Sequence, residues 1–191
     1  MTSLRQFEPQ DLLRMNLTNL DPLTENFNID FYLHYLTKWP SLFTVAENQQ
    51  GHIIGYMMGK LEEDPLWVKF TPHYLPWHGH VTALTVAPQF RRLGLAQLLT
   101  LALERGSEDQ KAWFVDLFVR ESNDTAIGLY KGMGYSIFRR VVDYYSDDLS
   151  GRMAAEDAFD MRKPLSRDKR RQYVRKNGET FRVMPEDIYH P

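Results

Sequence analysis

The sequence predicts an α/β fold: a single mixed, mostly antiparallel sheet with helices on both of its faces. Two observations predict this fold. In the second half of the chain, strand-like apolar runs alternate with helical runs, an order typical of parallel strand pairing. In the first half, two strand-like runs flank a short polar turn, as in an antiparallel hairpin. The 191 residues suffice for one domain, expected over residues 1–165, followed by a charged C-terminal tail over residues 166–191.

The elements of the first half follow from turn residues and periodicity. Pro9 suits the first turn of a helix, Asp30 is a candidate cap for a second helix, and Pro40 should end that second helix. The expected elements are a strand at 3–7, helices at 8–19 and 31–39, strands at 42–47 and 52–62 around the turn at 48–51, and a proline-rich loop at 63–76.

The second half is read in the same way. Gly106 should end its first helix, and Ser122 or Asn123 can cap the next. The run at 112–120 is almost continuously apolar, as expected for a central strand. The expected elements are a strand at 78–87, a helix at 91–106, a strand at 112–120, a helix at 122–134, and strands at 135–146 and 157–165.

Composition excludes several classes of site and of protein. Because the chain has no cysteine, it has no disulfide, zinc–thiolate site or cysteine nucleophile. The formal net charge of −2 gives no global electrostatic reason to bind nucleic acid. No run approaches the ~20 apolar residues of a membrane span, and the N-terminus lacks the apolar stretch of a signal peptide, so a cytoplasmic protein is expected.

Charge is segregated near the C-terminus. Residues 141–160 carry six acids against one base, and residues 162–176 carry eight bases against one acid. We expect the basic run to be a solvated tail, since charge runs are usually solvated. An electrostatic contact with a partner protein or with ribosomal RNA is the alternative.

A basic turn precedes the helix expected at 91–106. Arg91 and Arg92 lie where the partial positive charge of a helix start disfavours cations, and a bound phosphate would reverse that cost. Gly94 lets a ligand approach the main chain, and the apolar residues around it can bind charge only through backbone N–H groups. Taken alone, the pattern favours a solvent-facing basic turn over a phosphate site.

The context of this turn changes that interpretation. The run "TVAP" leads into Arg-x-x-Gly-x-Ala, and a further strand–helix unit, "VDLFVRESNDTAIGLYKGMGY", follows. The arrangement resembles the GNAT superfamily of N-acetyltransferases, which implies the GNAT fold with a central pair of splayed parallel strands. The resemblance also implies acetyl-CoA as cosubstrate and no metal. The residues that it implies for acetyl-CoA are Leu84, Thr85, Val86, Arg91, Arg92, Leu93, Gly94, Leu95, Ala96, Asn123 and Tyr130.

Longer motifs resemble one family within this superfamily. They are "NLDPLTENF", "FYLHYLTKWP", "WHGHVTALTVAPQFRRLGLA", "VDLFVR", "LYKGMGYS", "VVDYYS" and "DAFDMRKPLSRD". From residue 1 to about residue 168 the chain is similar to catalytic subunits of the N-terminal acetyltransferase B (NatB) complex; residues 64–76 depart from the pattern. The resemblance implies transfer of acetyl to the α-amine of the initiator Met of nascent chains that begin Met-Asp, Met-Glu, Met-Asn or Met-Gln.

The same resemblance implies partners. A large helical-repeat auxiliary subunit should dock on the first two helices to form a heterodimer. The complex should meet nascent polypeptide N-termini at the ribosome. Neither a membrane nor direct specific binding to nucleic acid is expected.

Acyl transfer from a thioester to an amine needs no nucleophile from the protein, because the substrate's own α-amine attacks. With a pKa near ~8, a fair fraction of that amine is already neutral. We expect a backbone N–H near Val86 to stabilise the oxyanion and Tyr130 to protonate the departing sulfur; a core tyrosine is the alternative. From the resemblance, the expected catalytic residues are Tyr130, Tyr145, which could relay a proton, and Asn123, whose alternative is a helix cap.

Recognition of the second substrate residue needs a polar side chain. Alternation places His78, His80 and Thr82 on one face of a strand. His80 can donate a hydrogen bond to an acid or an amide, which would explain tolerance of both. A structural His78, or a metal site that includes His73, are alternatives, but no acid lies at ligand spacing.

The tyrosine pair should contact the peptide. Because Tyr144 and Tyr145 are adjacent on a strand, their rings should point to opposite faces, one packing and one reaching the peptide. From the resemblance, Glu25 contacts the peptide and Phe27 lines a pocket for the initiator Met. The expected substrate-binding residues are Glu25, Phe27, His80, Thr82, Tyr144 and Tyr145.

Two other functions remain open at this point. An enzyme of the same superfamily could acetylate a lysine side chain or a small amine, with no regard to the second residue of a peptide. A non-catalytic acyl-CoA-binding subunit would bind the cofactor without turnover.

Overall fold

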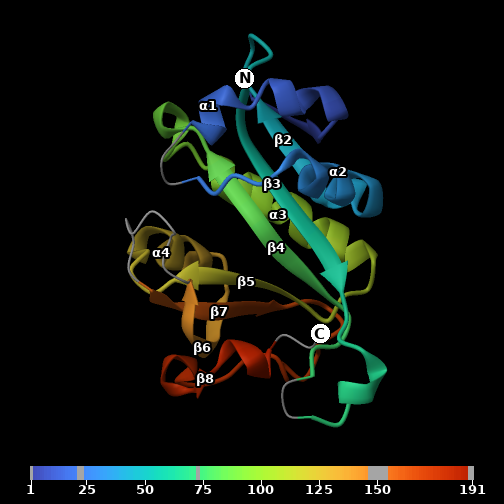
Figure 1. Cartoon of the computed structure of the whole chain (residues 1–191), viewed down its shortest axis with the longest axis vertical. Helices are drawn as coiled ribbons and strands as arrows, with labels where there is room; N and C mark the ends of the chain where they lie inside the picture. Colours follow the sequence, from blue (N-terminus) through green and yellow to red (C-terminus); the bar gives the residue numbers. More distant parts are fainter. Residues whose placement is uncertain (1, 21–23, 72–73, 146–154, 189–191) are drawn as a thin grey trace. The chain divides into compact units, whose positions relative to one another are not determined.

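The structure, a computed structural model, describes residues 2–20, 24–71, 74–145 and 155–188 (Figure 1). The chain divides into two compact units, Met1–Leu61 with Gly79–Gln110, and Glu62–His78 with Lys111–Pro191. None of the helices in the described part of the chain combines the length and hydropathy that a membrane crossing requires.

The first unit is built on four strands. They are neighbours in the order β1 (Ser3–Gln6), β2 (Phe43–Glu47), β3 (Ile53–Glu62) and β4 (His78–Val86). The pairs β1–β2 and β2–β3 are antiparallel, as predicted for the hairpin. All four strands were predicted within one residue of their observed ends.

The N-terminal helix predicted at 8–19 is not continuous. It consists of a 3₁₀ turn (Pro9–Leu13) and the short helix α1 (Asn16–Asn19). The buried carboxylate of Asp11 accepts hydrogen bonds from the guanidinium of Arg5 on β1, at 2.6 and 2.8 Å. This pair ties the first turn to the strand, so the chain forms two separate turns rather than one helix.

The second helix, α2 (Ile29–Lys38), begins earlier than predicted. Its cap is Asn28 rather than Asp30, because Asn28 Oδ1 accepts a hydrogen bond from the backbone N–H of Phe31 at 2.8 Å. Asp30 lies in the first turn, where its negative charge interacts favourably with the helix dipole. The helix ends before Pro40, as predicted.

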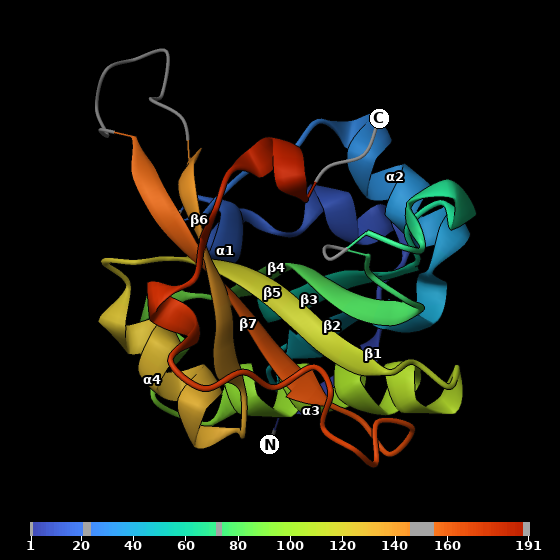
Figure 2. The same ribbon diagram turned by 90° about the horizontal axis from the view of Figure 1, so that it is seen from below.

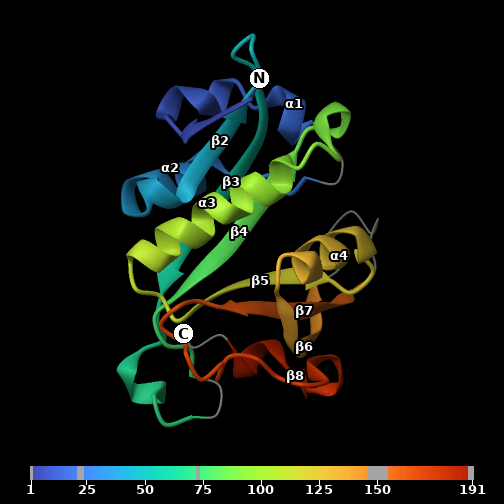
Figure 3. The same ribbon diagram turned by 180° about the vertical axis from the view of Figure 1, so that it is seen from behind.

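Helix α3 (Leu95–Asp109) starts after the basic turn and runs through Gly106, so the prediction that Gly106 ends it is wrong. A Cβ at Gly106 would lie 2.6 Å from Leu42 Cδ2, which makes this glycine a packing position. Gly59 on β3 has the same role, because a Cβ there would lie 2.2 Å from Leu103 Cδ1 of the helix. Figure 3 shows α3 across the strands of the first unit.

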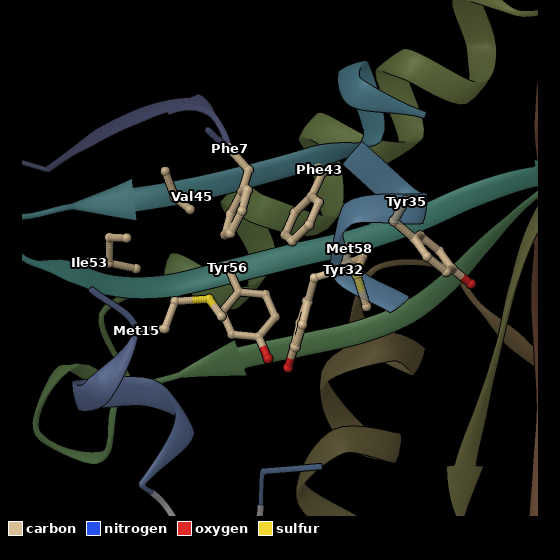
Figure 4. Close-up of a cluster of buried hydrophobic side chains, with 9 residues drawn as sticks. All are labelled: Phe7, Met15, Tyr32, Tyr35, Phe43, Val45, Ile53, Tyr56 and Met58. Atoms are coloured by element: carbon tan, nitrogen blue, oxygen red, sulfur yellow. The ribbon is translucent and has the colours of Figure 1, made fainter. Parts of the chain in front are cut away.

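The opposite face of β3 carries the main core. Tyr56 and Met58 alternate with the glycines of the α3 face, and they pack with α2 and with the stacked rings of Phe7 and Phe43, whose centroids are 3.8 Å apart (Figure 4). In this unit, helices therefore cover both faces of the sheet, as predicted.

The second unit has its own four strands. Their order is β5 (Phe114–Arg120), β7 (Glu156–Pro164), β6 (Ser136–Tyr145) and β8 (Arg182–Val183). Strand β7 pairs antiparallel with β5 and β6, and β8 pairs parallel with β6. Helix α4 (Asp124–Gly132) is capped by Asn123, whose Oδ1 accepts from Ala126 N at 3.1 Å. Only β8 was not predicted.

The C-terminal segment folds onto β6 (Figure 2). The guanidinium of Arg175 lies 4.3 Å from the ring centre of Phe138 and 3.8 Å from that of Phe181. Gly178 is closely packed, since a Cβ there would lie 2.0 Å from Ile137 O. The basic run was predicted to be a solvated tail. Residues 169–171 are exposed, as predicted, but other residues of the C-terminal segment are packed. Residues 146–154 of the predicted acidic run lie outside the described part.

Two arginines of the second unit are fully buried. Arg139 and Arg162, each with 2% of its side chain exposed, donate to the carboxylate of Asp160, which has no exposed surface. The nitrogen–oxygen distances are 2.7 Å for Arg139 Nε and 2.7 Å for Arg162 Nη2. The guanidinium of Arg162 also lies 3.7 Å from the ring centre of Phe138. One carboxylate therefore compensates two buried cations.

In the stretch predicted as a loop, 63–76, the described residues 63–71 and 74–76 form a loop that contains a 3₁₀ turn (Leu66–Val68). Two hydrogen bonds close its base. The backbone N–H of Asp64 donates to the carbonyl oxygen of Leu75 at 2.9 Å, and the backbone N–H of Leu75 donates to Asp64 Oδ2 at 2.7 Å. The side chains of Leu66, Trp67 and Phe70 are exposed.

The packing of α3 on β3 yields a stability prediction. Gly59→Ala should lower the free energy of unfolding by about 1–3 kcal/mol, because the new methyl would overlap Leu103 Cδ1 and lie 2.7 Å from the backbone oxygen of His80. Gly128→Ala is the matched control, since a Cβ at Gly128 in α4 meets nothing within 4 Å. It should be neutral or stabilising by up to about 1 kcal/mol. Urea denaturation measures both; equal stability of the two variants would contradict the packing role.

Candidate active site

The basic turn forms the start of α3. Gly94 is the N-cap with φ +78°, and no side chain caps the helix there. Arg92 also has a positive φ, +65°. Because the first N–H groups of a helix have no partner within it, Leu95 and Ala96 present backbone donors at this end. A Cβ at Gly94 would meet nothing within 4 Å, so the approach to the main chain is open. The geometry fits an anion held by backbone groups.

Arg91 turns back toward the preceding strand. Its Nε donates to the carbonyl oxygen of Val86 at 3.1 Å, so that carbonyl already has a donor. Arg92 and Leu93 are exposed, and Leu84 and Thr85 precede Val86 at the end of β4. The strand end and the turn are therefore joined by a side chain as well as by the chain itself.

The loop before α2 is organised by aromatic rings. The ring of Phe27 stacks on Phe31 at 4.5 Å and meets Tyr32 edge-on at 5.7 Å. The backbone N–H of Phe27 donates to the hydroxyl of Tyr32 at 3.3 Å. Glu25, two residues earlier, is exposed. The predicted pocket wall, Phe27, is thus held in a defined position.

Strand β4 joins this cluster through Thr82. Its hydroxyl donates to the hydroxyl of Tyr35 at 2.9 Å, and Tyr35 packs against Phe31 at 4.8 Å. His80 is half-buried two residues before Thr82. The structure therefore links two of the predicted peptide residues, Phe27 and Thr82, through the rings of α2.

His78 has a structural environment. It is buried, its ring stacks on Phe114 at 4.8 Å, and its Nδ1 lies 2.7 Å from the carbonyl oxygen of Pro76. This favours the structural alternative for His78. Within the described ranges no three His, Cys, Asp or Glu side chains gather as metal ligands would. His73, named in the metal alternative, lies outside those ranges.

Tyr130 lies on the buried side of α4. Its ring meets Tyr135 edge-on at 5.4 Å. Burial raises the pKa of Tyr130 well above its ordinary value, and the neighbouring Tyr145 adds to the rise. The hydroxyl therefore stays protonated at neutral pH and remains able to donate. Asn123, exposed at the start of the same helix, uses its carbonyl oxygen as the cap.

The prediction that Tyr144 and Tyr145 point to opposite faces is wrong. Their ring centroids are 5.0 Å apart, and both contact Phe118: Tyr144 stacks on it at 4.6 Å, and Tyr145 donates to its carbonyl oxygen at 3.2 Å. The guanidinium of Arg120 lies 4.0 Å from the ring centre of Tyr145. The cause is an irregularity of β6, where Asp143 has φ +50° and the register shifts between Val141 and Tyr145.

The residues that hold these groups were not predicted from the sequence. Tyr32 and Tyr35 carry hydroxyls on the buried face of a helix that was interpreted only as apolar. Their spacing of three residues on one face is the signal that could have identified them. No local signal indicates Arg120 or Phe118, because their contacts with the tyrosine pair span more than twenty residues.

Comparison with known proteins adds four likenesses. Residues 10–135 match the model of the acetyltransferase (GNAT) family. The chain is 52% identical, over 98% of its length and 99% of the relative's, to the N-terminal acetyltransferase B complex catalytic subunit naa20 of Schizosaccharomyces pombe. It is similar to the crystal structure of Chaetomium thermophilum Naa20 in complex with a bisubstrate analogue, with a TM-score of 0.93 and 53% identity over 98% of this chain and 100% of that one. It also resembles a chain of the NatB complex bound to CoA and MES, with a TM-score of 0.72 and 44% identity over 85% of this chain and 99% of that one. These likenesses confirm the predicted fold class.

Proposed function

This chain belongs to the GNAT acetyltransferase family and, within it, to the catalytic subunits of the NatB complex, and we propose that it acetylates initiator Met residues followed by Asp, Glu, Asn or Gln. The full-length likeness to those subunits carries this proposal. The chain is an N-α-acetyltransferase, and acetyl-CoA is its acetyl donor. The specificity for the second residue of the substrate rests on side chains of this protein.

Residues 84–96 of the first unit supply most of the contacts to acetyl-CoA. The turn Arg91–Ala96, with backbone donors at the start of α3, holds the pyrophosphate. Backbone groups of Leu84, Thr85 and Val86 serve the pantetheine arm, and the hydrogen bond from Arg91 to Val86 joins the strand end to the turn. The Nδ2 amide of Asn123 is a further donor to the arm, because the cap uses only its oxygen.

The reaction requires a positioned amine, a stabilised oxyanion and a proton for the leaving group. The neutral α-amine of the substrate attacks the thioester carbonyl, and the backbone N–H of Val86 stabilises the oxyanion. When the tetrahedral intermediate collapses, the carbon–sulfur bond breaks and the hydroxyl of Tyr130 protonates the departing sulfur. Tyr145 relays the proton that the amine loses to solvent water, and Tyr130 regains its proton from solvent.

The peptide is read by both its first and its second residue. Phe27, fixed by Phe31 and Tyr32, packs against the initiator Met side chain. Glu25 pairs with the α-ammonium or the peptide backbone. His80 donates to the acid or amide of the second residue, Thr82 lies beside it on the strand, and Tyr144 and Tyr145 hold the peptide backbone.

The protein acts as one subunit of a heterodimer. Five apolar side chains around the first two helices are exposed and suit a protein partner. They are Leu13, Leu17, Leu20, Ile29 and Leu33. The partner is a large helical-repeat auxiliary subunit, and the complex works in the cytoplasm on nascent chains at the ribosome, without direct specific contact with nucleic acid.

The specificity is tested with peptides that differ only at the N-terminus. Initial rates of acetyl-CoA turnover by the heterodimer should be at least tenfold higher for Met-Asp and Met-Asn peptides than for Met-Lys and Ser-Glu peptides, since a missing hydrogen bond costs about 1–3 kcal/mol. Equal rates on all four would contradict the proposal and favour an enzyme for general amines. Cofactor binding without any turnover would favour the non-catalytic alternative.

His80→Ala tests the side chain that reads the second residue. Its kcat/KM should fall about tenfold or more on Met-Asp and Met-Asn peptides alike, and the difference between Met-Asp and Met-Lys should shrink. His52→Ala, an exposed histidine of the same unit, is the control and should change neither value. An unchanged preference for Met-Asp over Met-Lys in His80→Ala would show that another residue determines the specificity.

A further inference from the structure

The tyrosine pair depends on an unusual backbone conformation. Asp143 adopts φ +50°, a left-handed conformation that costs a non-glycine residue free energy unless its surroundings impose it. The irregularity lies immediately before Tyr144, and it brings two adjacent rings to the same side of β6. Some contact has to hold Asp143 in this conformation.

The side chain of Asp157 on β7 makes that contact. Its Oδ1 accepts a hydrogen bond from the backbone N–H of Asp143 at 2.9 Å. Its Oδ2 accepts from Arg140 Nε at 2.5 Å, and Arg182 Nη2 lies 3.7 Å away. One nearly buried carboxylate thus joins the bulge to β6, to β7 and to the C-terminal strand β8.

The charge of this carboxylate persists at neutral pH. Burial alone would raise the pKa of Asp157, but the N–H of Asp143 and the guanidinium of Arg140 outweigh that effect and lower it. The pKa of Asp157 is lower in the folded than in the unfolded chain. The carboxylate is therefore ionised, and its contact with Asp143 is present, throughout the physiological pH range. It is lost only as the pH falls through the lowered value.

The preceding residue holds the pair from the other side. Glu156 accepts from Arg120 Nη1 at 3.2 Å and from the backbone N–H of Ser122 at 2.7 Å. Arg120 is the cation that lies over the ring of Tyr145. Two consecutive acids on β7 therefore fix the backbone before the pair and the cation above it.

We propose that Asp157 is a positioning residue for the peptide substrate, because it fixes the β6 bulge that turns Tyr144 and Tyr145 to the same side. The inference rests on the function proposed above, which makes the pair a contact for the peptide. Asp157 itself does not touch the substrate. Its effect should therefore fall on peptide binding and on the proton relay through Tyr145, while the binding of acetyl-CoA is spared.

Kinetics of the full-length chain in its heterodimer test this role. Asp157→Ala should raise KM for a Met-Asp peptide about tenfold and lower kcat, while KM for acetyl-CoA stays within about twofold. Glu121→Gln is the matched control: it removes the negative charge of the other acid that pairs with Arg140, at 2.5 Å, and leaves the contact with Asp143 intact. It should change none of these values.

A second substitution separates the backbone effect from loss of charge. Glycine adopts positive φ without steric cost, so adding Asp143→Gly to Asp157→Ala should restore at least half of the lost affinity for peptide. If the double variant is as impaired as Asp157→Ala alone, the bulge is not the cause and the proposal is overturned.

Hydrogen exchange tests the contact without any substrate. The amides of residues 140–145 should exchange about tenfold faster in Asp157→Ala, with unchanged rates in α3. Unchanged exchange at 140–145 would overturn the contact itself, and faster exchange with an unchanged KM for peptide would overturn the positioning role. If the wild type acetylates no Met-initiated peptide, the proposed function fails and the positioning role fails with it, while the exchange rates still decide the contact.

Discussion

Tyr130→Phe is expected to lower kcat by at least ~100-fold while KM for acetyl-CoA changes little. The departing thiolate needs a proton, and general acids contribute about 10²–10⁴-fold to such steps. The substitution removes only the hydroxyl and keeps the buried ring that packs against Tyr135. Initial rates at saturating acetyl-CoA and peptide measure the effect.

The pH dependence follows from the same group. Burial raises the pKa of Tyr130, so the hydroxyl stays protonated below that raised value and does not limit the rate at moderately alkaline pH. The wild-type kcat/KM should rise with pH through the pKa of the substrate amine, near ~8, and then stay level to about pH 10.5. A fall centred near pH ~10 would mean that the acid has the ordinary pKa of a tyrosine.

Tyr135→Phe is the control for Tyr130. It removes a hydroxyl from an equally buried ring in contact with Tyr130, and it should retain at least half of the wild-type kcat. If the two variants lose activity to the same extent, packing of the ring pair explains the loss. If Tyr130→Phe keeps more than about a third of the activity, Tyr130 is not the proton donor.

Asp160→Ala is expected to lower the free energy of unfolding by about 3–5 kcal/mol. This carboxylate accepts from both Arg139 and Arg162, which are almost fully buried. Burial lowers the pKa of Arg139, against the opposing influence of Asp160. Removing the carboxylate leaves two cations in the interior without their shared anion.

Urea denaturation of the purified chain measures the loss. Glu121→Gln, which breaks the more exposed pair with Arg140, should cost less than about 1 kcal/mol. A loss below about 1.5 kcal/mol in Asp160→Ala would show that other groups or water compensate the two arginines.

Much of the fold could be predicted because its signals are local. The hairpin of β2 and β3 follows from alternation around Asn48–Gly51, and β7 follows from the run that begins at Asp157. Asn123 as a cap follows from the residue type at a helix start. These features involve residues close in sequence, so a short window contains both the cause and the effect.

The errors involve distant partners. Gly106 was predicted to end a helix, but Leu42, which packs against it, lies more than sixty residues earlier. The C-terminal segment was interpreted as a charged tail because its charge is visible in the sequence, whereas the rings of Phe138 and Phe181 that enclose Arg175 are not identifiable as its partners.

In the candidate active site, too, local features were predicted correctly and features that depend on distant residues were not. The turn at Gly94 was predicted from residue types, and its open approach agrees with that prediction. The relation between Tyr144 and Tyr145 was predicted from the alternation of a regular strand, and that rule fails at Asp143. The contact that imposes the irregularity comes from Asp157 on another strand, so no pattern around the tyrosines reveals it.

The central claim is that the acceptor is the α-amine of a Met-initiated chain. One peptide that begins Met-Asp and carries a single internal lysine offers both kinds of amine to the heterodimer. Mass-spectrometric fragmentation after reaction with acetyl-CoA should place the acetyl group on the α-amine and leave the lysine free. Acetyl on the lysine, or equal acetylation of the same peptide with a blocked N-terminus, would contradict the claim.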